Sequence, residues 1–313
     1  MKETRRSFLL KATAAAAAAA SAQGAGYSPA PFPFSAAAME PIERAGPPQI
    51  KISCCAYSLR RYLGGKNPSM TMEDFLMWAA EVGLRAVELT SYYFPPNADE
   101  AYFHRIRRKA FLLGLDISGT AVGNNFCVPP GPQRENQIAL VKKWIDRAAL
   151  FAAPCIRIFA GGAPRGVDPD QARKWVVECI EECCAYAAQH GVMLALENHG
   201  GVVADSEGVL KIVRAVKSPW FGLNLDTGNF RTEDPYTDIE RVAPYAVTSH
   251  IKVMVTPRGK PAREADFERI FSIFRKVGYR GYASLEYEGR KEPKADARKY
   301  IKLLQKLAGE NYM

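Results

Sequence analysis

The chain has 313 residues, of which 48% are hydrophobic and 24% are charged, so it can bury a large core and is not expected to be disordered. A formal net charge of +9 is mild for this length, and no strong basic patch accompanies it, which argues against nucleic acid as a partner. The seven cysteines are an odd number and include two adjacent pairs, so buried free thiols are expected rather than a secreted disulfide framework.

The N-terminal segment 1–22 has the features of an export signal. Arg5 and Arg6 precede Lys11 and a weakly hydrophobic alanine run, which ends in small residues that suit signal peptidase. This order resembles a twin-arginine (Tat) signal, which implies export of an already folded protein to the periplasm. Residues 23–48 are rich in Ala, Pro, Gly and Ser, and we expect them to form a linker. No later apolar run approaches the roughly 20 residues that span a bilayer, so the mature chain is expected to have no membrane span.

From residue 49 to residue 313, short apolar runs alternate with longer amphipathic ones. The short runs predict eight strands, at 51–57, 86–90, 116–122, 155–159, 193–197, 222–226, 247–252 and 282–286. Helical spacing predicts helices between them, at 72–82, 100–113, 135–151, 169–190, 206–216, 267–277 and 295–307. Eight strand-helix units in about 260 residues favour an α/β fold of the closed (βα)8 TIM barrel type over an open sheet.

Polar residues close four successive predicted strands near the C-terminus. Glu197, Asp226, His250 and Glu286 each follow a largely apolar run. In a (βα)8 barrel these are the C-terminal strand ends, where the active site of this architecture lies. Three clustered carboxylates would repel one another without a cation, so the pattern predicts one divalent metal ion on these four residues. Carboxylates with one imidazole suit Mn, Mg or Co, and Zn or Fe would also fit.

The motifs around these residues carry a family resemblance. They are Leu196-Glu197-Asn198-His199, Leu225-Asp226-Thr227-Gly228-Asn229, Ser249-His250-Ile251-Lys252 and Ser284-Leu285-Glu286-Tyr287. Together they resemble the xylose isomerase-like TIM barrel superfamily, in particular its sugar phosphate isomerase and epimerase branch, over about residues 50 to 307. The resemblance implies that the four residues bind the metal and that Glu197 and Glu286 are catalytic, moving a proton. The related endonuclease branch needs more histidines than the four present here.

Five further residues are candidates for binding substrate. Tyr57 and Glu88 end the first two predicted strands and are expected to be walls of the pocket or ordinary strand-end residues. Lys252 shares the strand face of the metal-ligand histidine, so it either reaches substrate oxygens or pairs with a site carboxylate. His199 points inward or has a structural role. Asn229 stands where many epimerases have a histidine, which weakens the link to any particular sugar.

The leading functional hypothesis is an exported, metal-dependent sugar isomerase or epimerase. It would abstract an α-proton through a metal-stabilised enediolate, with a small carbohydrate as substrate. The same α-deprotonation of an oxidised (keto) sugar or glycoside could instead expel a leaving group, which would make the protein a lyase or dehydratase. A third alternative is a non-catalytic periplasmic carbohydrate-binding protein. Assembly into homo-oligomers is left open by the sequence.

Overall fold

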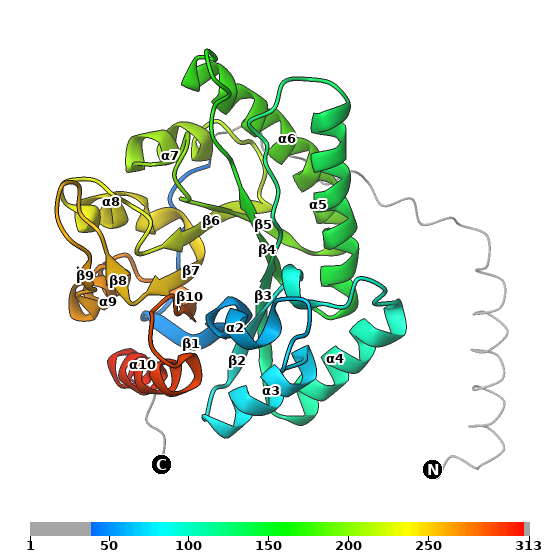
Figure 1. Cartoon of the computed structure of the whole chain (residues 1–313). Coiled ribbons are helices and arrows are strands. Elements are labelled where there is room, and N and C mark those ends of the chain that lie inside the picture. Colours follow the sequence, from blue (N-terminus) through cyan, green and yellow to red (C-terminus); the bar gives the residue numbers. More distant parts are fainter. Residues whose placement is uncertain (1–38, 310–313) are drawn as a thin grey trace, which may run out of the picture. The chain divides into compact units, whose positions relative to one another are not determined.

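The computed structural model describes residues 39–309, and in them eight parallel strands close into a barrel. Around the barrel the strand order is β1, β10, β7, β6, β5, β4, β3 and β2 (Figure 1). The barrel strands are β1 (Gln49–Cys55), β2 (Ala86–Thr90), β3 (Asp116–Ala121), β4 (Cys155–Phe159), β5 (Met193–Glu197), β6 (Phe221–Asp226), β7 (Ala246–Lys252) and β10 (Arg280–Glu286). The TIM barrel predicted from the alternation is therefore confirmed.

Helices cover the outside of the barrel and connect successive strands (Figure 1). The α-helices are α2 (Arg60–Leu63), α3 (Met72–Glu81), α4 (Glu100–Leu112), α5 (Pro132–Leu150), α6 (Pro169–His190), α7 (Ser206–Val213), α8 (Pro235–Val242), α9 (Phe267–Lys276) and α10 (Pro293–Ala308). The remaining elements of the described residues are three short 3-10 turns and one antiparallel strand pair. The turns are η1 (Ala56–Leu59), η2 (Ser91–Tyr93) and η3 (Ala243–Tyr245), and the pair is β8 (Met254–Val255) with β9 (Arg263–Glu264). None of the helices in residues 39–309 is both long enough and apolar enough to cross a membrane.

Short polar side chains start most of the helices. The side-chain oxygens of five aspartates accept hydrogen bonds from free backbone N–H groups in the first turns of α4, α6, α7, α8 and α9: Asp99, Asp168, Asp205, Asp234 and Asp266. Thr71 caps α3 in a reciprocal capping box with Asp74. These caps fix where each loop ends and each helix begins, and so they position the loops that follow the strands.

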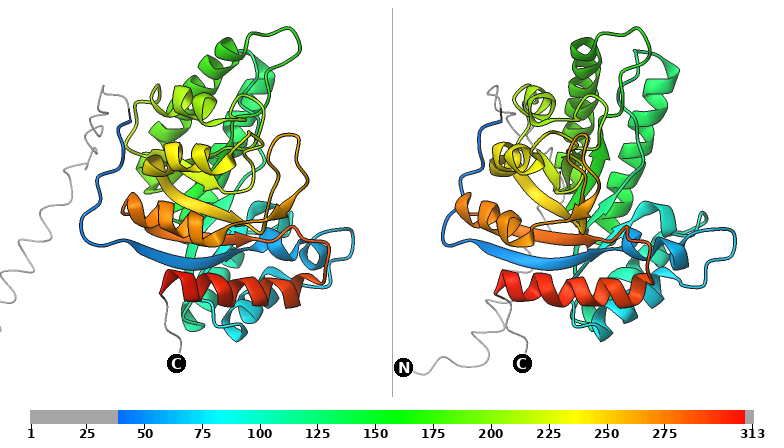
Figure 2. Two further views of the ribbon diagram at one scale, coloured as in Figure 1. Left: turned by 90° about the vertical axis from the view of Figure 1, so that its left-hand side faces the viewer. Right: turned by 60° about the vertical axis from the view of Figure 1, so that its left-hand side comes forward.

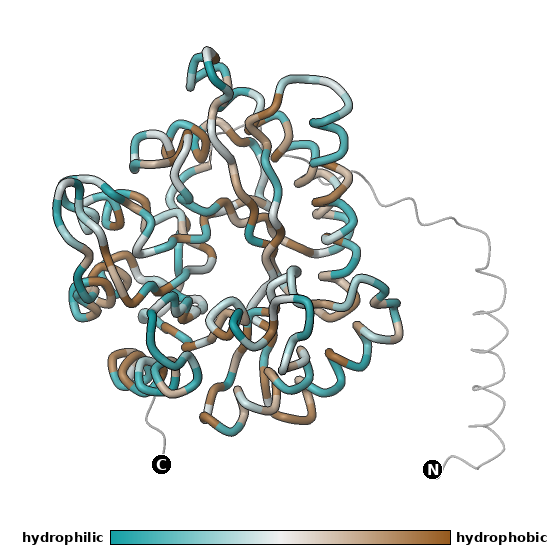
Figure 3. Tube along the Cα trace, in the orientation of Figure 1, coloured by the Kyte–Doolittle hydropathy of each residue, from teal (hydrophilic) through white to brown (hydrophobic). Residues whose placement is uncertain are grey.

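A single hydrophobic core fills the barrel and the layer between strands and helices. Along the outer helices the chain alternates between hydrophobic and hydrophilic residues, which is the pattern of helices buried on one face (Figure 3). Phe94 packs against Phe103, Trp144 and Phe151, with ring centroids 5.2 to 5.7 Å apart. This aromatic cluster joins the loop after β2 to helices α4 and α5. All seven cysteines are buried and free, as the sequence predicted.

The loops that follow the strands project from one end of the barrel. Figure 2 turns the barrel onto its side, and there the loop between α2 and α3 and the β8–β9 hairpin extend beyond the same end. The last residues of β5, β6 and β10 also lie at this C-terminal end, because all barrel strands run parallel. The structure thus brings the predicted site residues to the end at which TIM barrels carry their active sites.

Two expectations about local structure are wrong. β1 ends at Cys55, and Tyr57 lies in the short turn η1 rather than at the end of the strand. Helix α8 was not among the predicted helices, although Asp234-Pro235 supplies the same cap and first-turn proline as the correctly predicted start of α6. The predicted export signal and residues 23–38 of the predicted linker lie outside the described residues.

Candidate metal centre

The four predicted ligand residues lie on four adjacent strands. Glu197, Asp226 and Glu286 are the last residues of β5, β6 and β10, and His250 lies two residues before the end of β7. Strand pairing places Asp226 directly beside His250. All four side chains are buried, with exposed fractions from 0 to 7%.

Two of the carboxylates, those of Glu286 and Glu197, face the Nδ1 atom of His250. Glu286 Oε2 lies 2.9 Å from Nδ1, and Glu197 Oε2 lies 3.5 Å from it. One potential ligand atom from each of Glu197, Asp226 and His250 lies within 4.8 Å of the others. The Oδ2 atom of Asp226 is buried without a hydrogen bond and has the ammonium group of Lys252 only at 3.6 Å, so a cation bound there would stabilise it further. Three carboxylates, one of which has the unsatisfied oxygen, and one imidazole nitrogen therefore fit a single divalent cation.

Glu197 is the most constrained of the three carboxylates. Its Oε2 accepts a hydrogen bond from Asn224 at 3.2 Å, and its Oε1 accepts one from Asn229 at 3.0 Å. The Nε atom of Arg157 lies 3.0 Å from Oε2, and both side chains of this ion pair are buried. Burial is the largest single influence and raises the pKa of Glu197, but the charge of Arg157 and the hydrogen bond and charge of His250 together hold it below its usual value.

Glu286 has different neighbours. Its contacts are with His250 and with the ammonium group of Lys252, whose Nζ lies 3.2 Å from Oε2. Burial opposes ionisation, but these two cations lower the pKa of Glu286 well below its usual value. A lysine side chain is long and flexible, so Lys252 holds Glu286 less rigidly than Arg157 and the two asparagines hold Glu197.

Lys252 also contacts two other carboxylates around the centre. Its Nζ lies 2.8 Å from Glu288 Oε2 and 3.6 Å from Asp226 Oδ2. Gly228 allows this placement, because a Cβ there would lie 2.5 Å from the Cβ of Lys252. Of the two roles considered for Lys252 from sequence, the structure thus shows the ion-pair partner directly. Burial raises the pKa of Asp226 to about 8, since Lys252 compensates its charge only in part.

Three other residues predicted from the sequence differ in how they contact the centre. Asn229 lies within the centre as a donor to Glu197. Tyr57 is half-buried near the centre, and the guanidinium group of Arg60 lies over its ring at 4.9 Å from the centroid. His199 is exposed, and its ring centroid lies 4.4 Å from that of Phe159, the last residue of β4.

Glu88, a candidate wall of the pocket, contacts the ligand histidine itself. It is 3% exposed, and its Oε2 lies 2.8 Å from His250 Nε2. Burial lowers the pKa of His250, but the charges of Glu88 and Glu286 outweigh burial and raise it well above its usual value.

Sequence reasoning missed several polar residues around the centre, among them Arg157 and Asn224. Each of these two stands inside a short apolar strand, β4 or β6, and each is buried. A charged or amide side chain in the middle of a buried strand is rarely tolerated without a partner, and that pattern was visible in the sequence. The partner, Glu197 in both cases, follows only from the order of strands around the barrel.

Comparison with known proteins agrees with this fold. The model of the family described as "Xylose isomerase-like TIM barrel" matches residues 76–307. The chain is 24% identical over 248 residues to "Putative hydroxypyruvate isomerase" of Xenopus laevis, covering 73% of this chain and 87% of that protein. It is 23% identical over 206 residues to "3-dehydroshikimate dehydratase" of Bacillus anthracis, covering 65% and 71%. The crystal structure of D-psicose 3-epimerase with D-tagatose from Clostridium cellulolyticum H10 superposes with a TM-score of 0.68 and 15% identity, covering 82% and 99% of the chains.

Proposed function

Because this chain belongs to the xylose isomerase-like TIM barrel family, we propose that it is a metal-dependent enzyme that removes a proton beside the carbonyl group of a sugar. The observation that carries the proposal is that Glu197 and Glu286 both face Nδ1 of His250, with a carboxylate oxygen of Asp226 within 4.8 Å of ligand atoms of Glu197 and His250. Fold alone would not support an activity, because TIM barrels host many chemistries.

The four residues would hold one divalent cation, with Mn, Mg or Co as the expected metals. When bound, the cation would supply Lewis-acid polarisation of the substrate's carbonyl and neighbouring hydroxyl oxygens. Asp226 and His250 serve as ligands only. Glu286 is ionised and loosely held, so it is suited to accept the proton from carbon, and Glu197 is the second candidate to move a proton.

The charges around the centre favour an uncharged sugar as substrate. Arg157 is paired with Glu197, and Lys252 is surrounded by Glu286, Glu288 and Asp226. Both cations are thus already compensated by carboxylates, which disfavours a phosphate group in their place. A free sugar is also the expected substrate of an exported protein, and we propose export through the resemblance of residues 1–22 to a twin-arginine signal.

Two products of the α-deprotonation are compatible with this centre. Return of the proton to the substrate gives an isomerase or epimerase, and loss of a leaving group gives a lyase or dehydratase. The unequal constraints on the two glutamates favour reactions that need one mobile base, which are isomerisation and elimination, over two-base epimerisation. The match to a protein named as a dehydratase also supports the lyase as the second candidate.

The test is an incubation of the purified protein with ketohexoses in deuterated water, with Mn²⁺ or with a chelator. Deuterium beside the carbonyl without net elimination supports the isomerase or epimerase, and an unsaturated product supports the lyase. A substrate that carries deuterium at the reacting carbon separates one base from two, since a single shuttling base returns part of the label to the product. Exchange that persists after complete metal removal would overturn the metal-dependent mechanism. Binding of a sugar without any exchange would support the non-catalytic binding protein.

A further inference from the structure

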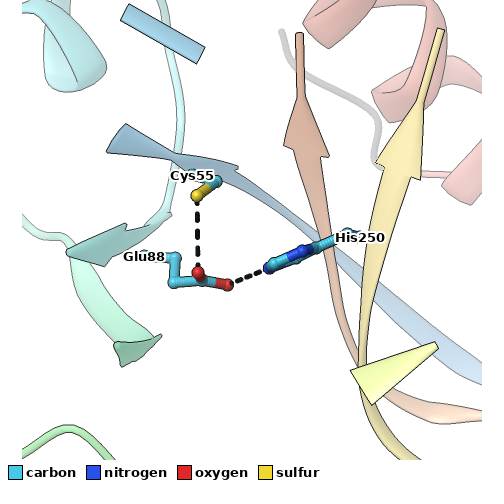
Figure 4. A group of neighbouring side chains, drawn as sticks. All are labelled: Cys55, Glu88 and His250. Atoms are coloured by element: carbon cyan, nitrogen blue, oxygen red, sulfur yellow. Dashed lines mark hydrogen bonds and ion pairs between the residues drawn. The ribbon is translucent and has the colours of Figure 1, made fainter. Parts of the chain in front are cut away.

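The carboxylate of Glu88 bridges the side chains of Cys55 and His250 (Figure 4). Its Oε2 lies 2.8 Å from Nε2 of His250, and its Oε1 accepts a hydrogen bond from the Cys55 thiol, with a sulfur-oxygen distance of 3.4 Å. The three residues come from β1, β2 and β7, and each is at most 3% exposed. Glu88 is therefore enclosed by protein on the side of His250 that faces away from Glu197 and Glu286.

The geometry of His250 gives its two ring nitrogens different surroundings. Nε2 faces Glu88, while Nδ1 faces Glu286 at 2.9 Å and Glu197 at 3.5 Å. An ionised carboxylate only accepts hydrogen bonds, so the nitrogen that contacts Glu88 must carry hydrogen. In a neutral imidazole the other nitrogen then carries the lone pair, and a metal ligand needs that lone pair.

We propose that Glu88 is a positioning residue that holds hydrogen on Nε2 of His250 and thereby directs the lone pair of Nδ1 toward the cation site. The proposal rests on the proposed function, because it assigns Nδ1 as a ligand of the cation bound by Glu197, Asp226 and Glu286. Carboxylates that hold a ligating histidine in this way fix both its tautomer and its ring orientation. Glu88 thus acts through His250 without contacting substrate.

One alternative for the same residues is a second metal ion. Potential ligand atoms of Cys55, Glu88 and His250 lie within 4.8 Å of one another. The distances instead match a chain of hydrogen bonds, since 2.8 Å is the spacing of a direct N–H to carboxylate bond. A second ion would also need Nε2 of His250 as its ligand, which would remove the hydrogen bond to Glu88. Metal stoichiometry separates the two: one ion per chain supports positioning, and two ions that involve Cys55 overturn it.

The test uses Glu88→Ala and Glu88→Gln in the full chain, with circular dichroism to establish that each variant is folded. Mn²⁺ affinity is measured by titration calorimetry. We expect Glu88→Ala to weaken Mn²⁺ binding by ~10- to 100-fold, the range seen when partners of metal-ligating histidines are removed. Glu88→Gln should restore most of this loss, because its amide oxygen still accepts the hydrogen of Nε2. Cys55→Ala is the matched control, since it removes the other neighbour of Glu88 and should leave Mn²⁺ affinity nearly unchanged.

A second readout follows the hydrogen itself. In protein labelled with ¹⁵N-histidine, the Nε2–H signal of His250 is expected in the wild type and in Glu88→Gln, and is expected to be lost in Glu88→Ala. Only four histidines are present, so a His250→Asn variant identifies the signal. If the wild type binds no metal, the proposed function fails, and the Nε2–H signal still tests the hydrogen bond to Glu88. If the wild type binds Mn²⁺ and Glu88→Ala keeps both the affinity and the signal, the role of Glu88 alone is overturned.

Discussion

The guanidinium group of Arg157 lies 3.0 Å from Oε2 of Glu197, and both side chains are almost completely buried. Arg157 also donates hydrogen bonds to the backbone oxygen of Val122 and to the hydroxyl of Tyr92. This ion pair joins β4 to the end of β5 and holds one wall of the candidate metal centre in place. Breaking such a pair by removing one partner leaves an uncompensated charge inside the barrel.

We expect Arg157→Met to lower the free energy of unfolding by ~3–5 kcal/mol, measured by urea denaturation of the metal-free protein. The double variant Arg157→Met with Glu197→Gln should lose less than the sum of the single losses, because no buried charge then stays unpaired. The control is Lys276→Met, which removes an exposed ion pair with Glu240 and should leave the free energy of unfolding nearly unchanged, because solvent screens that pair. If Arg157→Met and Lys276→Met lower the free energy of unfolding equally, the special role of the buried pair is contradicted.

Replacement of Glu286 tests the proposed base. Glu286→Gln keeps an oxygen that can ligate the cation but removes the group that accepts a proton, so kcat should fall by ~10²–10⁴-fold while metal affinity changes much less. Asp226→Asn is the comparison variant, in which loss of activity should follow loss of metal. Both are measured as rates at saturating Mn²⁺ together with calorimetric affinities. Activity of Glu286→Gln that returns fully with excess metal would rule out its role as base.

The buried cysteines predict both a chemical and a pH effect. All seven thiols should fail to react with a thiol reagent at neutral pH in the folded protein and should react completely in urea. Burial raises the pKa of Cys127 and of Cys179 to about 11. Because the folded-state pKa is the higher one, this contribution to stability is complete below the ordinary thiol pKa of about 8.5 and is lost as pH rises toward 11. Urea midpoints that stay constant or rise over this interval would contradict the assignment.

The cap of α3 is a local test of the fold. The side chain of Thr71 accepts a hydrogen bond from the backbone N–H of Asp74, and Asp74 accepts one in return from the backbone of Thr71. Thr71→Ala should therefore lower the free energy of unfolding by ~1 kcal/mol, whereas Thr71→Ser keeps the hydroxyl and should cost little. The pair is compared by chemical denaturation, and an equal cost for both substitutions would mean that the methyl group matters rather than the cap.

The sequence was sufficient to predict the barrel, because each strand and helix is marked locally. Apolar runs that end in Glu197, Asp226 and Glu286 mark the strand ends, and parallel strands place those ends on one side. The contacts that these residues make with side chains from distant strands could not be predicted in the same way. Glu88 meets His250 across 162 residues, a contact that depends on closure of the barrel.

Helix α8 was missed for a different reason. It has eight residues, and a short helix carries little periodic signal, so only its Asp234 cap and Pro235 could have indicated it. The position of Tyr57 was also predicted wrongly, because the local sequence does not mark where β1 ends. The apolar run of β1 continues through Ala56 in the sequence, but the backbone turns after Cys55.

Arg157 and Lys252 place two permanent positive charges beside the carboxylates that would bind the metal. They relieve part of the mutual repulsion that these acids would otherwise exert, and the raised pKa of Asp226 relieves more by keeping that group protonated below about pH 8. The barrel should consequently fold before any metal is captured. Chelation should leave a native-like apoprotein that can be reloaded, so the ion that it carries would depend on which metals are available as well as on the ligands themselves.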